Sequence, residues 1–455
     1  MYIYESILGK PLSGSASALK NYFENHVAGR PLVIHIHGGL NDGSDAQGLA
    51  FELTPKYESA GGHPLFFVWH SDILHSLAAK LESTVRKVVN NGDFRKLETS
   101  VRASIEKPKN KKKLKKARAE RKSLAKSERA RNYDIPIAVQ TKQKYRPDEK
   151  EVEEAIDKKF SPLDFVPKIN SKHARYVNKN AGRNFGQERL NWFTDAVSFL
   201  VDDTIEVIAR IMWRKAHDDD RGIPLLIYEE VLRCLKIDRA IRPVWDGMKS
   251  SIERSFKKGG AGTAFIKSLN NYLKKNPDTR IVLIGHSAGT IYVSHLIDAA
   301  AKKLPSNIKF EVVFQASACT FKDFDRLVYP HRKRIKGIRF FGLGQKREKD
   351  DVVFHGLYPR SLLYFVSGVI EKHADESLIG MATYFREGAY YKKEVKRIRE
   401  YMQPPKLTRV WAPRLGIPGG SSNATRHEDF SKEHSSLESV QDIIRLGIEN
   451  TGTKA

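Results

Sequence analysis

Cysteine is scarce in this chain of 455 residues, which contains only Cys234 and Cys319. Two cysteines so far apart cannot form a disulfide framework, and they match none of the usual spacings of zinc ligands. We therefore expect two free, buried thiols in a reducing compartment.

Long uncharged apolar runs are also missing. The most apolar stretch, residues 193–213, contains five charged side chains, which excludes a simple membrane span there. The first 15 residues lack the basic segment and apolar core that mark a secretory signal peptide. These absences predict a soluble, cytoplasmic protein.

Acidic residues are outnumbered, since 79 Lys and Arg face 54 Asp and Glu, which gives a net charge of +25. Nearly half of the excess lies in residues 107–131, where 13 Lys or Arg accompany two Glu. This basic segment has no aromatic residue and no apolar stripe. It is either a solvated insertion or an arm that binds an anionic partner, a membrane surface or nucleic acid. A shorter basic stretch, residues 331–339, could add to such a site or form a solvated edge.

What the chain does contain is an alternation of apolar strands and helices near both ends. The pattern predicts strands over residues 31–37, 64–72, 280–285, 310–318 and 361–370, and helices over residues 45–61, 290–304 and 436–449. Apolar strands that alternate with helices are typical of α/β proteins, in which helices cover both faces of a mostly parallel sheet.

The middle of the chain has a different pattern, rich in helical periodicity. Examples are a long amphipathic helix predicted over residues 187–216 and shorter ones over 223–235 and 262–277. The predicted organisation is therefore a core in two parts, residues 1–75 and 278–455, with a mostly helical insertion over residues 76–277. The insertion contains the basic segment, residues 107–131.

Residues 281–290, IVLIGHSAGT, contain the pattern Gly-x-Ser-x-Gly around Ser287. Alone the pattern is weak, but here it follows an apolar strand and opens a helix. Gly285 and Gly289 leave room for a tight turn, with His286 and Ala288 on either side of the serine. The pattern predicts that Ser287 is a nucleophile; the alternative is an ordinary serine at the start of a helix.

A serine nucleophile needs an oxyanion site, a base and an acid that orients the base. The oxyanion donors are predicted to be the N–H groups of Ala288 and of Gly39 or Leu40, in the segment HIHGGL (35–40). His35 and His37 are expected to be structural.

The base is expected near the C-terminal helix. His427 is predicted, because it lies in a polar loop before that helix, and His434 is the alternative. The acid is predicted to be Asp375, in a turn beyond the strand expected over 361–370, with Glu371 as the first alternative. Four further aspartates stay open as weaker candidates: Asp323, Asp325, Asp350 and Asp351. The order Ser287, Asp375, His427 is nucleophile, acid, histidine.

With these elements the sequence resembles the α/β-hydrolase superfamily, most closely a group of poorly characterised bacterial serine hydrolases of the esterase or lipase type. The resemblance rests on HIHGGLNDG, HPLFFVWHSD, IGHSAGTIYVSHL, VFQASACTF, LIGMATYF and TRHEDF. It implies ester hydrolysis without metal or organic cofactor, and it supports His427. One departure is the acidic pair Glu428 and Asp429, where small residues are expected; these carboxylates either raise the pKa of His427 or are solvated.

Three functions follow as hypotheses. The first is a serine hydrolase that cleaves a small-molecule or lipid carboxylic ester through a Ser-His-Asp triad. The second is a phospholipase-type enzyme recruited to anionic membrane. The third is a non-catalytic protein of hydrolase fold that binds nucleic acid through its basic segment.

Overall fold

The computed structural model describes residues 1–39, 43–70, 77–90, 92–106, 207–208, 210–211, 214–215, 221–235, 237–386, 393–402 and 409–452. The basic segment, residue Leu40 and most of the helix predicted over 187–216 lie outside these residues.

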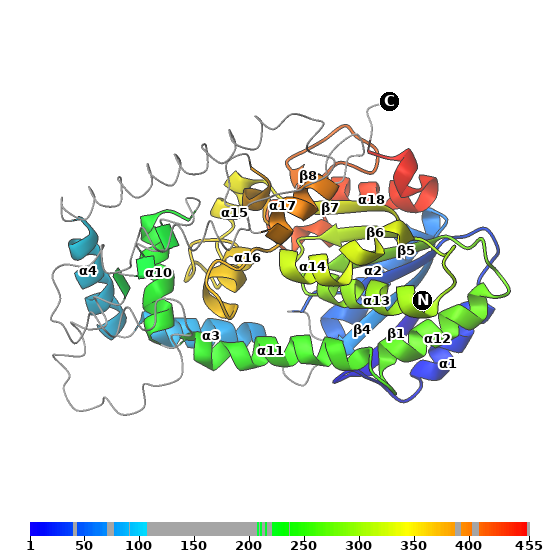
Figure 1. Ribbon diagram of the computed structural model, residues 1–455, viewed down its shortest axis with the longest axis horizontal. Coiled ribbons are helices and arrows are strands. Elements are labelled where there is room, and N and C mark those ends of the chain that lie inside the picture. The colour runs from blue at the N-terminus through cyan, green and yellow to red at the C-terminus, as the bar shows by residue number, and fades with distance from the viewer. Residues whose placement is uncertain are drawn as a thin grey trace, which may run out of the picture. The chain divides into compact units, whose positions relative to one another are not determined.

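The described residues form one eight-stranded sheet in the order β2-β1-β4-β3-β5-β6-β7-β8 (Figure 1). Every neighbouring pair is parallel except β1 and β2, which are antiparallel. The strands are β1 (Tyr2–Ile7), β2 (Lys10–Pro11), β3 (Leu32–Ile36), β4 (His63–His70), β5 (Ile281–His286), β6 (Phe310–Gln315), β7 (Ile335–Leu343) and β8 (Arg409–Ala412).

Helices cover both faces of this sheet. They include α1 (Ser15–Glu24), α2 (Gly43–Ser59), α12 (Ala261–Leu273), α13 (Gly289–Lys303), α14 (Phe321–Leu327) and α18 (His434–Leu446). Side chains alternate along a strand, so neighbouring residues face opposite layers. On β4, Phe66 belongs to the core cluster that α2 and α18 complete. Phe67 instead contacts Phe265 of α12 and Tyr292 of α13. The predicted α/β class, with a mostly parallel sheet between helical layers, is confirmed.

After β6 the chain also contains several shorter elements. They are the helices α15 (Gln345–Asp350), α16 (Leu362–Phe365) and α17 (Lys393–Tyr401), the π-helix η3 (Val366–Ile370), and the 3-10 helices η2 (Tyr329–Arg334), η4 (Ala382–Phe385), η5 (Asp429–Ser431) and η6 (Ile448–Asn450). Helices α3 (Leu77–Val89), α4 (Gly92–Glu106), α10 (Ile223–Cys234) and α11 (Ile237–Ser255) complete the described elements.

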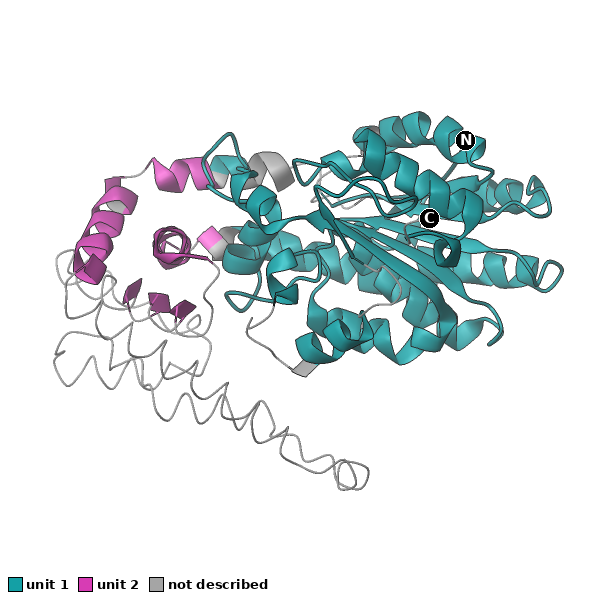
Figure 2. Cartoon of the chain, turned by 90° about the horizontal axis from the view of Figure 1, so that it is seen from above, with its two compact units in different colours: residues 1–84, 239–388, 394–455 teal, residues 85–238, 389–393 magenta. Residues whose placement is uncertain are grey.

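The chain divides into two compact units (Figure 2). Unit 1 comprises residues 1–84, 239–388 and 394–455, and unit 2 comprises residues 85–238 and 389–393. The insertion predicted over 76–277 therefore extends too far in both directions. At its C-terminal end the reason is packing, because α12 lies against α1 and α13 and so belongs to the core.

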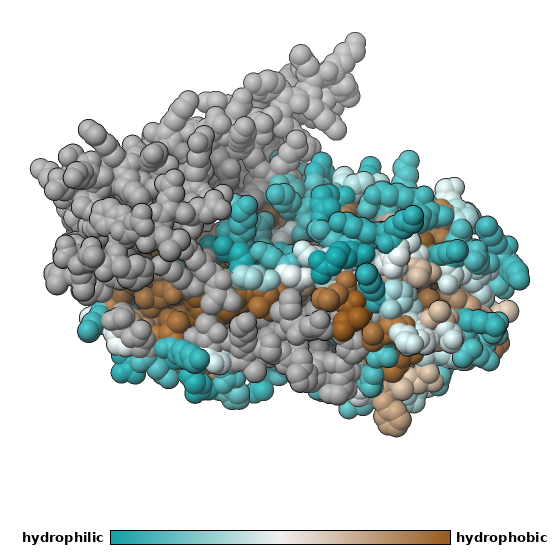
Figure 3. All heavy atoms as spheres, turned by 90° about the horizontal axis from the view of Figure 1, so that it is seen from below, coloured by the Kyte–Doolittle hydropathy of each residue, from teal (hydrophilic) through white to brown (hydrophobic). Residues whose placement is uncertain are grey.

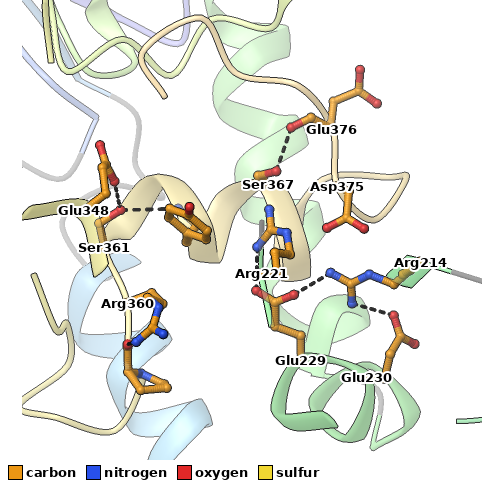
Figure 4. Close-up of polar contacts among 12 residues, drawn as sticks. Arg214, Arg221, Glu229, Glu230, Glu348, Arg360, Ser361, Ser367, Asp375 and Glu376 are labelled. Atoms are coloured by element: carbon orange, nitrogen blue, oxygen red, sulfur yellow. Dashed lines mark hydrogen bonds and ion pairs between the residues drawn. The ribbon is translucent and has the colours of Figure 1, made fainter. Parts of the chain in front are cut away.

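In unit 2, α4 packs on α10, and the rings of Phe94 and Tyr228 meet edge to face at 5.3 Å. A buried ion cluster also belongs to this unit (Figure 4). The Arg214 guanidinium bridges Glu229 and Glu230, and Arg221 donates to Glu229 at 2.6 Å. Buried charges of opposite sign are therefore paired in this unit.

One local prediction is wrong, and the open question about residues 331–339 is answered for two of their side chains. Residues 361–370, predicted as a strand, form α16 and η3; the Ser361 side chain caps the start of α16 and is bound to Glu348 (Figure 4). An apolar run of about ten residues fits a buried helix as well as a strand. In the basic stretch 331–339, Arg334 and Arg339 are buried and donate to main-chain carbonyls, so these two side chains are structural.

Among the described residues visible in Figure 3, hydrophilic side chains predominate and apolar ones gather in a few patches. Among the described residues, no helix combines the length and the apolar character needed to cross a membrane.

Candidate active site

Ser287 lies on a sharp turn between β5 and α13, at the carboxyl end of a central strand. Its φ of 51° is in the left-handed region, which a serine rarely adopts. The turn is tightly packed, because a Cβ on Gly289 would lie 2.4 Å from the carbonyl oxygen of Ile36. The Ser287 N–H donates to Gln315 at 2.8 Å, and this bond helps to hold the strained conformation.

His427 meets this serine. Its Nε2 lies 3.0 Å from Ser287 Oγ, and the two residues are only 6% and 7% exposed. The alternative base, His434, starts α18, where its side chain is 83% exposed and pairs with Glu438. Residues 140 positions apart are therefore in hydrogen-bond contact, which is the arrangement a nucleophile and its base require.

The loop that carries His427 is fixed at several points. One oxygen of Asp429 accepts from the main chain of Thr425 and Arg426, each at 2.8 Å. Gln315, at the end of β6, donates to the carbonyl of Phe430 at 3.0 Å. Asp429 therefore stabilises the turn around His427, a role that the sequence did not indicate.

The main chain of His427 is held on both sides. Its N–H donates to Oδ2 of Asp351 at 3.1 Å, and its carbonyl oxygen lies 3.0 Å from Nε2 of His286. A carbonyl can only accept, so the proton of a neutral His286 ring must be on Nε2. Asp351 and His286 thus both hold the main chain of His427.

The carboxylate beside His427 is that of Asp351, and not that of the predicted Asp375. Asp351 directly follows α15, which begins just beyond β7. Asp375 lies in a loop after η3, with a φ of 63°, and makes no hydrogen bond to His427. The prediction of Asp375 depends on a strand over 361–370, but that segment is helical, and the strand whose end leads to the carboxylate beside His427 is β7.

Glu371, the alternative acid, binds side chains of α11. Its Oε1 accepts from Nε1 of Trp245 at 2.8 Å and from Nζ of Lys249 at 2.5 Å. Both donors lie on α11, and Arg242 of the same helix donates to the carbonyl of Ile370. Glu371 therefore attaches α11 to η3.

The two glycines after β3 lie against the turn of Ser287. A Cβ on Gly38 would be 3.3 Å from Cβ of Ser287, and one on Gly39 would be 2.9 Å from Cβ of Ala288. In the part of the chain that the structure describes, the N–H groups of Gly39 and Ala288 donate to no other group. Two such N–H groups, in loops that meet beside Ser287, are what an oxyanion site needs. Leu40, the other predicted donor, lies outside the described residues.

His37 supports this glycine loop, in agreement with the structural role predicted for it. Its Nδ1 lies 2.7 Å from the carbonyl oxygen of Gly38, and its Nε2 accepts from the N–H of Trp69 at 3.2 Å. The Trp69 indole stacks on the imidazole and donates to the His37 carbonyl. His35 is buried in the core and bound to the Tyr57 hydroxyl at 3.0 Å.

Burial sets the charge states of the site. Desolvation lowers the pKa of His427, and the nearby His286 ring lowers it further. The same cause raises the pKa of Asp351 to about 6, although its hydrogen bond from His427 opposes this. His427 is therefore neutral at pH 7 and able to accept a proton. Of the two alternatives for Glu428 and Asp429, the one in which they raise the pKa of His427 is not met, since this pKa is lowered.

Two contacts have no counterpart in the sequence predictions: that of His286 with the main chain of His427, and that of Met248 of α11 with Gly39. A Cβ on Gly39 would lie 2.8 Å from the Met248 sulfur. Asp351 could have been preferred had β7 been recognised, because strand ends carry the site in parallel sheets. Nothing in the sequence signals the contact of Met248.

Comparisons with protein-family models, with curated proteins and with solved structures found no match to this chain.

Proposed function

We propose that this protein is a serine hydrolase of the α/β-hydrolase type that cleaves carboxylic esters through an acyl-enzyme. The observation that carries the proposal is the 3.0 Å contact between Ser287 Oγ, on a left-handed turn at the end of β5, and His427 Nε2. A strained serine next to a neutral, buried imidazole is poised for attack on a carbonyl.

In the proposed first step, Ser287 Oγ bonds to the ester carbonyl carbon and its proton passes to His427 Nε2. The carbonyl oxygen becomes an oxyanion that the N–H groups of Gly39 and Ala288 stabilise. The C–O bond to the leaving alcohol then breaks, and His427 returns the proton to that alcohol. Water repeats the sequence on the acyl-enzyme and releases the acid.

Asp351 is proposed as the acid of the triad in place of Asp375. It holds the main chain of His427, and as a carboxylate it would stabilise the imidazolium that forms during attack. The chain order Ser287, Asp351, His427 retains the order of nucleophile, acid and histidine that supports the superfamily assignment.

A fluorophosphonate probe tests the proposal, because it labels only activated serines. We expect a mass increase on Ser287 in the folded protein, none in Ser287→Ala, and full labelling in the control Ser59→Ala, an exposed serine of α2. If the folded protein is not labelled while a reference hydrolase in the same tube is, the proposal fails.

An anionic partner remains a second proposal, supported only by the net charge of +25 and the basic segment. For a membrane, co-sedimentation with liposomes should increase with their content of anionic lipid. For nucleic acid, deletion of residues 107–131 should abolish a salt-dependent gel shift.

A further inference from the structure

The residue before the nucleophile, His286, contacts the residue that serves as its base. His286 lies at the end of β5, and its Nε2 is 3.0 Å from the carbonyl oxygen of His427. The two rings meet with centroids 5.4 Å apart at 61°, and both residues are at least nine-tenths buried. This contact joins segments 141 residues apart in the sequence, so it is a tertiary bond of the site itself.

The direction of the bond is determined by chemistry. The His427 carbonyl accepts, and Nε2 of His286 donates. On the other side of the same ring, Nδ1 of His286 lies close to Gly38, since a Cβ added there would be 2.8 Å away. His286 therefore lies between the glycine loop and the loop of the base, both of which contribute to the proposed reaction.

The geometry points to His286 as a positioning residue for His427, a role that rests on the proposed function. Ser287 and His286 are adjacent in the chain, so two contacts fix the position of His427 relative to Ser287. One is the hydrogen bond between Ser287 Oγ and Nε2 of His427, and the other is the hydrogen bond from Nε2 of His286 to the carbonyl oxygen of His427. Asp351 provides a third attachment at the main-chain N–H.

Removal of the His286 donor would leave a buried carbonyl unsatisfied and allow the loop of His427 to shift. A misplacement of about 1 Å in a catalytic group costs on the order of 100-fold in rate. Substrate binding does not depend on the base, so we expect removal of the His286 donor to lower kcat and to leave KM nearly unchanged.

The test compares His286→Leu, which has no donor, with His286→Gln, whose side-chain amide reaches about as far as the imidazole Nε2. The matched control is His434→Gln, the same change at an exposed histidine. We expect kcat to fall on the order of 10- to 100-fold in His286→Leu with KM changed less than about twofold, to recover largely in His286→Gln, and to be unaltered in the control. Equal losses in the Leu and Gln variants, or losses that appear in KM, would overturn the role.

A crystal structure of His286→Leu separates this inference from the proposed function. The expected result is that His427 Nε2 moves out of hydrogen-bond reach of Ser287 Oγ. If His427 keeps its place, His286 does not position it, whether or not the wild-type protein hydrolyses esters. If His427 moves but the wild-type protein shows no labelling by fluorophosphonate, the positioning contact stands and the proposed function fails.

Discussion

At the scale of single residues, two carboxylates differ in their relation to His427. Asp351 accepts a hydrogen bond from the main chain of His427, whereas Asp375 lies in a loop after η3. Asp351 is 7% exposed and has a pKa of about 6, as burial disfavours its charge. This contact with His427 favours Asp351 over Asp375, whose prediction depended on a strand that the structure does not contain.

We expect Asp351→Asn to lower kcat by roughly 100-fold or more, because an amide has no charge to stabilise the imidazolium. The amide oxygen can still accept from the His427 N–H, so the fold should persist. Asp375→Asn is the matched comparison, since asparagine tolerates the left-handed conformation of Asp375. Steady-state kinetics of both variants show which carboxylate assists His427. A larger loss of kcat in Asp375→Asn than in Asp351→Asn would favour Asp375 as the acid.

The acid limb of the pH profile reports on His427. Burial lowers the pKa of this ring from its ordinary value of 6.5, so neutral imidazole persists into more acidic solution. The logarithm of kcat/KM should therefore bend downward at a pH below 6.5, measured where circular dichroism shows a folded protein. A bend above pH 7 would mean that the ring is stabilised as a cation.

At the scale of elements, the glycine loop after β3 and the start of α13 are fitted to each other. Gly39→Ala would place a methyl carbon 2.9 Å from Cβ of Ala288, and one of the two backbones must move. Displacing one oxyanion donor should lower kcat by about 100-fold.

The companion variant Ala288→Gly removes the methyl group that Gly39→Ala would meet. We expect the double variant to recover part of the lost kcat, and a double-mutant cycle measures this coupling. Losses that simply add would show that the two elements do not constrain each other. The Met248 sulfur is the other neighbour, but a flexible thioether can move aside.

Much of this element pattern was predictable. The central strands β3, β4, β5 and β6 are short apolar runs bounded by turns, and α13 follows its strand directly. Ser287, His427 and the glycine pair could be found because each lies where a strand ends or a helix begins. The peripheral strand β7 could not be predicted in this way. It contains Lys336 and Arg339, which are untypical of a buried strand, and Arg339 donates to carbonyls of the C-terminal segment.

The prediction of Asp375 depended on a different segment. Residues 361–370 are apolar on every side because they are buried in a helix and π-helix, and this burial erases the periodicity that would identify them. The prediction of Asp375 as the acid depended on the assignment of residues 361–370 as a strand.

At the scale of the whole molecule, buried histidines link folding to pH. The pKa values of His35 and His427 are lowered to about 3, and that of His286 is also lowered, in each case first by desolvation. Below pH 6.5 the unfolded chain binds protons that these folded side chains do not. Their contribution to stability is therefore complete above pH 6.5 and is lost as the pH falls toward 3.

The free energy of unfolding should consequently fall by at least roughly 2 kcal/mol between pH 7 and pH 5, as each such histidine contributes about 1.4 kcal/mol per pH unit. Asp351 acts in the opposite sense, because its raised pKa lets the folded state take up a proton near pH 6. Urea denaturation at the two pH values measures the balance. Unchanged or greater stability at pH 5 would show that these rings titrate normally.

The discontinuity of unit 1 has a consequence for biosynthesis. β3 ends at Ile36, but its neighbour β5 starts only at Ile281. At about 5–20 residues per second, a ribosome needs on the order of 10–50 s to make the stretch between them. Throughout that interval the nascent strand Leu32–Ile36, which is apolar and hydrogen-bonded to β4 at most, has one edge open to other chains. The strand that leads to the glycine loop of the candidate site is thus open to aggregation until β5 has been made.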